Sequence, residues 1–144
     1  MTHSIYWNPI LETLPQERLQ ALQLKKFRRI LEWAYNNSPF YTRLYQQAGL
    51  EPGDIKTLAD IQKVPTVEKA MLRESQLGQE ILYGDMLAVP LSQVTTFRQT
   101  SGTTGTPVYQ ADTWQDWEWW TECWCYILYA QGYRDTDRVF IPFG

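Results

Sequence analysis

The chain contains few of the residues that build disulfide frameworks or zinc sites. It has two cysteines and one histidine among 144 residues. Cys123 and Cys125 are too few and too close for a framework. Side chains two positions apart on a helix point to nearly opposite sides, so this pair cannot share a metal either. His3 lies in the N-terminal tail. Zinc chemistry and a disulfide-stabilised secreted fold are therefore not expected.

An excess of positive charge and long apolar runs are also missing. A formal net charge of −3 provides no long-range attraction to nucleic acid or to an anionic membrane. No apolar run approaches the roughly 20 residues that cross a bilayer. Residues 1–9 lack the positive start and the apolar segment of a signal peptide. The sequence therefore predicts a cytoplasmic protein with reduced thiols and with no nucleic-acid or membrane partner.

The first long helix is predicted over residues 16–36, after Pro15. Its apolar residues recur at helical spacing, at Leu24, Phe27, Leu31 and Ala34. Four basic residues share this helix, namely Lys25, Lys26, Arg28 and Arg29. They could bind phosphate or nucleic acid, or they could form a solvated face. We favour the solvated face because Glu32 and the net acidity dilute their field.

Shorter helices follow, separated by proline and glycine. Ser38 and Pro39 have the residue types of a helix cap and a first helical position, and Gly49 is placed to end that helix. Residues 57–60 have the spacing of a capping box, and Thr66 is placed to cap a helix over residues 69–75. Residues 1–83 therefore predict a mainly helical layer, with too little alternation to build a sheet of its own.

From residue 84 the pattern changes to short β-prone runs around a glycine-rich loop. Strands are predicted over residues 87–89, 94–99 and 107–111. Thr113 and Asp116 then form a capping-box pattern that opens a helix to about residue 131, and Gly132 ends it. Residues 138–143 predict a final core strand. The fold class is therefore α/β, with a helical layer followed by strands that flank the loop, a tryptophan-rich helix and a last strand.

The tryptophan-rich helix is apolar on more than one side. Its apolar stripes contain Trp117, Trp119, Trp120, Cys123, Trp124 and Tyr126. Core packing is the interpretation we favour, because stripes at helical spacing usually face a core. An aromatic wall for an aryl substrate or a subunit interface, and so a homodimer, are the functional alternatives. Any part of this surface without a cover favours self-association.

The run Thr-Ser-Gly-Thr-Thr-Gly-Thr-Pro at residues 100–107 has the composition of a phosphate-binding loop. Gly102 and Gly105 let the backbone turn so that consecutive N–H groups can point at one anion. Ser101, Thr103 and Thr104 add hydroxyl donors without bulk, and a hydroxyl can also bind Mg²⁺. The alternative is a surface hairpin of the same composition. A Walker A loop is excluded, because only two residues separate the glycines and no lysine follows, and a dinucleotide fingerprint is excluded because Gly-x-Gly is absent.

The order Ser-Gly-Thr-Thr-Gly-x-Pro resembles the phosphate loop of adenylate-forming enzymes, and most closely that of the phenylacetate-CoA ligase group with the related coenzyme F390 synthetases. The flanking segments at residues 37–41, 49–61 and 64–69, with Leu72-Arg73, are similar to the same group. The resemblance covers most of residues 16–144. It implies the N-terminal portion of a large adenylation domain, which uses ATP, Mg²⁺ and CoA to activate a small carboxylic acid, aryl or phenylacetate-like, as an acyl-adenylate.

By this resemblance, the residues that bind the phosphates are Ser101, Gly102, Thr103, Thr104, Gly105 and Thr106, with Thr104 as the Mg²⁺ ligand. Most members of the group have lysine where this chain has Thr106. We therefore expect the loop to bind pyrophosphate more weakly, and Mg²⁺ to offset a larger part of the negative charge of the phosphates. The group's adenine site and catalytic lysine have no counterpart in residues 1–144. We therefore expect a fragment that does not complete the reaction alone and assign no catalytic residue. Adenylyl transfer of the F390 type and a non-catalytic nucleotide-binding module remain alternatives.

Overall fold

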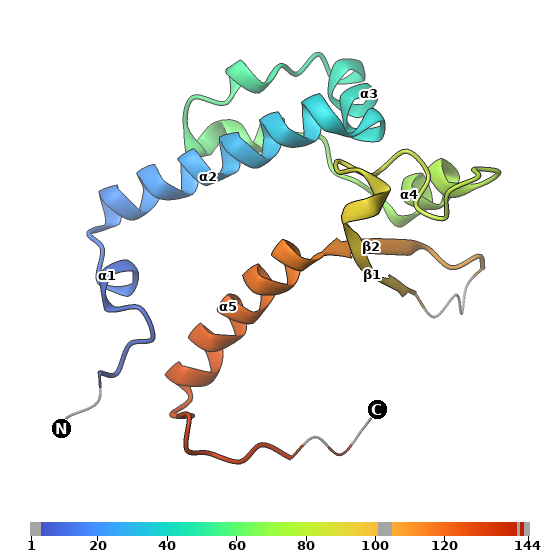
Figure 1. The fold of residues 1–144 in the computed structure, drawn as a ribbon. Coiled ribbons are helices and arrows are strands. Elements are labelled where there is room, and N and C mark those ends of the chain that lie inside the picture. The colour runs from blue at the N-terminus through green and yellow to red at the C-terminus, as the bar shows by residue number, and fades with distance from the viewer. Residues whose placement is uncertain (1–3, 101–104, 141, 143–144) are drawn as a thin grey trace.

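The protein is described by a computed structural model that covers residues 4–100, 105–140 and 142. The helical layer begins with α1 (Pro9–Glu12), α2 (Gln16–Asn37) and α3 (Pro39–Gln47). Two 3₁₀ turns follow, η1 (Pro52–Asp54) and η2 (Leu58–Lys63), and then α4 (Lys69–Gln76). A third turn, η3 (Leu91–Gln93), leads into β1 (Val94–Gln99), which is followed by β2 (Tyr109–Thr113) and α5 (Trp114–Ala130). In Figure 1 the β-hairpin lies between α4 and α5.

The core lies where α2, α3 and the following turns meet. Its buried residues are Leu31, Phe40, Leu44, Tyr45, Leu50 and Ile55. Leu31 lies on the apolar stripe predicted for α2, and Phe40, Leu44 and Tyr45 are the buried residues of α3. The basic residues of α2 (Lys25, Lys26, Arg28 and Arg29) are exposed, as expected for a solvated face.

Local capping signals are confirmed at three helix starts. Ser38 accepts a hydrogen bond from the Tyr41 N–H, and Pro39 is the first residue of α3. The capping boxes of η2 and α5 are both present, with Asp60 and Asp116 accepting from the cap residues. Thr66 is not a cap, because α4 begins after Glu68 and has no side-chain cap.

Two predicted strands are wrong. Residues 87–89 form no strand, and residues 138–140 form none either, while residues 141, 143 and 144 lie outside the described part of the chain. The second strand of the hairpin does form, although it begins at Tyr109 rather than Pro107. A β-prone run becomes a strand only beside a hydrogen-bonding partner, and these runs have none among the residues described.

Helix α5 is less buried than its composition predicts. None of its residues is fully buried, and Trp119 and Trp124 are 58% and 48% exposed. The middle and the C-terminal half of α5 are tied to the N-terminal segment, because Trp7 donates to Glu122 (3.0 Å) and Tyr129 donates to the Ser4 carbonyl (2.9 Å). Among the helices that the structure describes, none is long and apolar enough to cross a membrane.

Candidate phosphate-binding site

The predicted loop joins the two strands of an antiparallel hairpin. Gln99 pairs with Tyr109 at the end of the ladder. Beyond it the Thr100 N–H donates to the Val108 carbonyl (3.0 Å), and the Val108 N–H donates to the Thr100 hydroxyl (3.0 Å). Val108 is buried. The two arms of the loop are therefore held together at residues 100 and 108, which fixes where the loop starts and ends.

Of the six residues predicted to bind phosphate, the structure describes two. Ser101, Gly102, Thr103 and Thr104 lie outside the described residues. Gly105 has φ +142°, in the region that favours glycine over residues with a side chain. Thr106 follows it on the arm that returns to β2. Their role in binding phosphate, and that of Thr104 in binding Mg²⁺, stay predictions.

Helix α4 holds the returning arm through two side chains. The Arg73 Nε donates to the Thr106 carbonyl oxygen at 2.9 Å. Gln76 makes two bonds to Tyr109, donating to its carbonyl (2.7 Å) and accepting from its N–H (2.9 Å). Gln76 thus pairs with the outer edge of β2 as a residue of a third strand would. The sequence analysis missed Gln76; its spacing of three from Arg73, which places both on one helix face, is the available signal.

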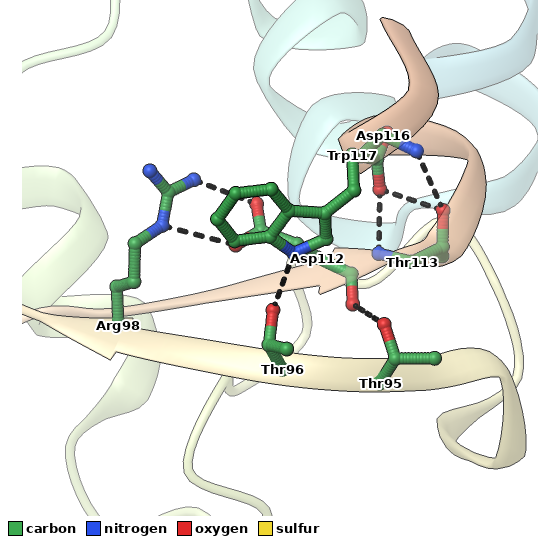
Figure 2. A network of polar contacts seen from close by, with 7 residues as sticks. All are labelled: Thr95, Thr96, Arg98, Asp112, Thr113, Asp116 and Trp117. Carbon is green, nitrogen blue, oxygen red and sulfur yellow. Dashed lines mark hydrogen bonds and ion pairs between the residues drawn. The ribbon is translucent and has the colours of Figure 1, made fainter. Parts of the chain in front are cut away.

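A charged pair joins β1 to β2, just before the start of α5 (Figure 2). Arg98 makes two hydrogen bonds to the carboxylate of Asp112, from Nε at 3.0 Å and from Nη2 at 2.8 Å. Asp112 is buried, and the guanidinium lies 4.6 Å from the centre of the Trp120 ring. A bidentate pair of this kind fixes direction as well as distance. It therefore orients the strand that leads directly into the loop.

Two further bonds in Figure 2 link the same elements. The indole N–H of Trp117 donates to the Thr96 hydroxyl at 2.8 Å, and the Thr95 hydroxyl donates to the Asp112 carbonyl at 3.2 Å. Together with the Thr113–Asp116 cap, they make the hairpin and the first turn of α5 one hydrogen-bonded unit. The sequence predicted the cap and missed the cross-strand pair.

The segment before the hairpin is anchored at the junction of α2 and α3. The fully buried Ser38 hydroxyl donates to the Met86 carbonyl (2.9 Å), and the Phe40 N–H donates to the Asp85 carbonyl (3.1 Å). Arg43 forms an ion pair with the Asp85 carboxylate at 2.5 Å. The helical layer thereby positions the chain that enters β1.

A cavity of about 380 Å³ opens beside the base of the loop. Tyr41, Lys69, Arg98, Thr100 and Tyr109 are among the residues that line it. Burial raises the pKa of Tyr41, so its hydroxyl stays protonated at neutral pH and can donate a hydrogen bond. The cavity therefore combines hydrogen-bond donors with the ammonium group of Lys69, a combination suited to an anionic ligand, while the charge of Arg98 is already paired with Asp112.

No family model matches the chain. Comparison with individual known proteins does find relatives, and they agree with one another. A phenylacetate-coenzyme A ligase of Thermus thermophilus is 35% identical over 138 residues, which are 96% of this chain and 30% of that protein. That of Escherichia coli is 34% identical over 134 residues, 93% of this chain and 29% of that protein. The chain thus spans less than a third of the length of these relatives.

The solved structures agree with the sequence relatives. A 2-hydroxyisobutyryl-CoA ligase in complex with 2-HIB-AMP and CoA, in its thioesterification state, superposes with a TM-score of 0.83 at 34% identity. The match covers 91% of this chain and 28% of that protein. The same ligase in the postadenylation state gives an equal TM-score. In sequence and in fold, the chain is related over nearly its whole length to the N-terminal part of the phenylacetate-CoA ligase group of adenylate-forming enzymes.

Proposed function

We propose that this chain supplies the phosphate-binding part of an ATP-dependent, AMP-forming ligase that joins a carboxylic acid to CoA. The observation that carries the proposal is the match of fold and sequence to a ligase solved with an acyl-adenylate and CoA. The anchored hairpin adds physical support. Its loop has both ends fixed by hydrogen bonds, which suits a site that must hold a phosphate chain without reorganising.

In the proposed reaction, a carboxylate oxygen of the acid attacks the α-phosphorus of ATP. The bond from that phosphorus to the bridging oxygen breaks, and pyrophosphate leaves with its electron pair. The CoA thiol then attacks the carbonyl carbon of the acyl-adenylate, and AMP leaves. Ser101, Gly102, Thr103, Thr104, Gly105 and Thr106 would hold the β- and γ-phosphates by backbone N–H and hydroxyl groups, which positions the α-phosphorus for attack.

Mg²⁺ fits a loop of this chemistry, because the ion is usually held by one or two protein oxygens together with substrate phosphates. We propose the Thr104 hydroxyl as the protein oxygen. Bound Mg²⁺ would offset charge on the phosphates. Thr106 adds only a hydroxyl on this arm of the loop.

The acid is proposed to be aryl or phenylacetate-like, since the sequence relatives are phenylacetate-coenzyme A ligases. A cytoplasmic location follows from the need for ATP and CoA. The boundary at residue 83 between a helical part and a loop-bearing part, and a homodimer through the exposed face of α5, stay predictions. Sedimentation velocity tests the homodimer.

A chimera tests the ligase proposal directly. Residues 1–144 would replace the corresponding segment of the Thermus thermophilus relative, which supplies the rest of its own ligase. We expect phenylacetate-dependent exchange of pyrophosphate into ATP and formation of phenylacetyl-CoA, both measured by chromatography. The same chimera with Gly105→Val is the control, because a β-branched residue is strained at φ +142°.

The outcomes separate the alternatives. A folded chimera that binds MgATP and forms no adenylate would contradict the ligase proposal and favour a nucleotide-binding module. Formation of an adenylate whose AMP passes to another acceptor, with no thioester, would favour the F390 type. For the isolated 144-residue chain we expect nucleotide binding and no acyl-CoA; detectable acyl-CoA would contradict that expectation.

A further inference from the structure

The outer edge of β1 presents backbone groups that the hairpin does not use. The Thr100 N–H points at β2, where it bonds to the Val108 carbonyl. Backbone groups alternate in direction along an antiparallel strand, so those of Phe97 and Gln99 point away from β2. Within the described part of the chain the sheet consists of β1 and β2 alone. The outward N–H and carbonyl groups of β1 are therefore available to a further strand.

This edge lacks the features that usually protect an exposed strand from pairing, such as lysine and proline. The sequence of β1 is Val-Thr-Thr-Phe-Arg-Gln, and its one charged residue, Arg98, is already paired with Asp112. The Phe97 side chain is 56% exposed and adds apolar surface to the edge. The other edge of the sheet differs, because Gln76 is bonded to it. An incoming strand therefore meets the least resistance at β1.

The residue pattern of β1 suits pairing with a second copy of the same strand. Two copies related by a two-fold axis, the commonest symmetry of oligomers, run antiparallel to each other. With the axis at Phe97, this residue lies opposite its own copy, and Arg98 lies opposite Thr96 of the second copy. With the axis at Arg98, two like charges would lie opposite each other, which is unfavourable. Charge therefore favours the register centred on Phe97.

The regular part of the strand is long enough for this register. The shift in pairing between Val94 and Thr96 disturbs only the start of β1, and residues 96–99 pair regularly with β2. In the register centred on Phe97, the outward N–H and carbonyl of this residue exchange two hydrogen bonds with those of its copy. The two phenyl rings then lie side by side on one face of the sheet, where aromatic cross-strand pairs are favourable.

We propose that β1 is a dimerisation edge, at which two copies of this chain pair through residues 96–99 and form a four-stranded sheet centred on Phe97. The physical gain is that a two-stranded ribbon is marginally stable, whereas a sheet of more strands is not. This inference does not depend on the proposed function, since it requires no nucleotide. It also differs from a dimer through α5, because no residue of that helix belongs to the pairing edge.

Sedimentation velocity of the 144-residue chain over a series of concentrations tests the proposal. We expect a monomer–dimer equilibrium for the wild type. Phe97→Lys keeps the backbone N–H and places two like charges at the axis, so we expect the dimer dissociation constant to rise about tenfold. Leu91→Lys is the matched control, because it adds the same charge at an apolar side chain that is 51% exposed and lies outside the sheet. We expect it to dimerise like the wild type.

Opposite charges at position 97 test the register. Phe97→Glu alone should dimerise as weakly as Phe97→Lys, because each variant opposes like charges. An equimolar mixture of the two places a lysine opposite a glutamate only if the residues at position 97 meet at the axis. We therefore expect the mixture to recover an affinity about tenfold higher than that of either variant alone. Circular dichroism checks that both variants fold.

Hydrogen exchange of the wild type provides a measurement that needs no variant. Pairing at this edge should slow exchange of the Phe97 and Gln99 amide protons as the protein concentration rises, measured residue by residue by nuclear magnetic resonance. Exchange of the Thr100 amide, which bonds to Val108 within the hairpin, should depend less on concentration.

Several outcomes would overturn the proposal. These are a wild-type chain that stays monomeric at every concentration, amide exchange at Phe97 that does not respond to concentration, and a mixture of the two charged variants that stays monomeric. Folded Phe97→Lys that dimerises like the wild type also overturns it. If Trp119→Glu then dissolves that dimer, α5 forms the interface instead.

Discussion

Among the glycines that the structure describes, Gly84 is the position where a single added methyl group has the largest predicted effect. Its φ is +59°, and a Cβ there would overlap the carbonyl oxygen of Ser75 and lie 2.9 Å from its carbonyl carbon. Both atoms belong to the backbone of α4, so no side-chain rotation relieves the overlap. Gly84→Ala therefore forces the segment before Met86 away from the helix that carries Arg73.

The magnitude follows from two separate costs. An L-residue in the left-handed region costs about 1–2 kcal/mol, and forcing a methyl group into occupied space costs about 1–3 kcal/mol more. We therefore expect Gly84→Ala to lower the free energy of unfolding by about 2–5 kcal/mol, a large share of the 5–15 kcal/mol typical of a folded domain. The measurement is urea unfolding at 25 °C, followed by far-ultraviolet circular dichroism.

Two other glycines provide matched controls. Gly78 has φ +71° with nothing within 4 Å of its added Cβ, so Gly78→Ala should cost only the conformational part, about 1 kcal/mol. Gly53 has neither a positive φ nor a close neighbour, so Gly53→Ala should be neutral or slightly stabilising. Equal unfolding midpoints for Gly84→Ala and Gly78→Ala would refute the reasoning, because the contact with α4 would then contribute nothing.

Three further predictions concern buried and capping polar groups. Ser38→Ala removes a helix cap and the bond to the Met86 carbonyl, so urea unfolding should show a loss of about 1–3 kcal/mol; an unchanged midpoint would contradict the cap. Asp112→Asn leaves Arg98 with a neutral acceptor and should cost about 1–2 kcal/mol in the same assay, whereas a neutral result would show that the pair is compensated by solvent. Hydrogen bonds from Lys63 and then from Thr57 hold the pKa of Asp60 below its ordinary value of 3.8, so its contribution to stability is complete above about pH 4 and is lost as the pH falls through the lower, folded-state pKa. Asp60→Asn should therefore flatten the fall in stability between about pH 4 and pH 2, and an unaltered acid profile would contradict that assignment.

The features that the sequence predicted correctly depend on residues close together in the chain. The capping boxes at Thr57 and Thr113 need only a carboxylate three positions later, and both form. The limits of α2 differ by one residue from the prediction, because its apolar periodicity and Pro15 are local signals. The hairpin is local in the same sense, since a short loop can only return its second strand beside the first.

The contacts that hold the candidate site were missed because they join residues far apart in the chain. Ser38 meets Met86 across 48 positions, and Arg73 meets Thr106 across 33. Which polar side chain reaches which carbonyl depends on how the helical layer packs, and neither composition nor periodicity contains that information. The prediction that α5 packs in a core was wrong for a related reason. Periodicity predicts which side chains form an apolar stripe, whereas neighbouring elements decide whether that stripe is covered.

The paired bonds of Gln76 also limit how the sheet can grow. The backbone donor and acceptor of Tyr109 that point away from β1 are both occupied by this one side chain. An additional strand, from this protein or from a second copy, would have to displace Gln76 before it could pair with β2 at that point. The outer side of β1 has no such obstacle among the side-chain bonds described. Helix α4 therefore gives a two-stranded sheet a closed edge beside its loop and directs any extension of the sheet to the opposite side.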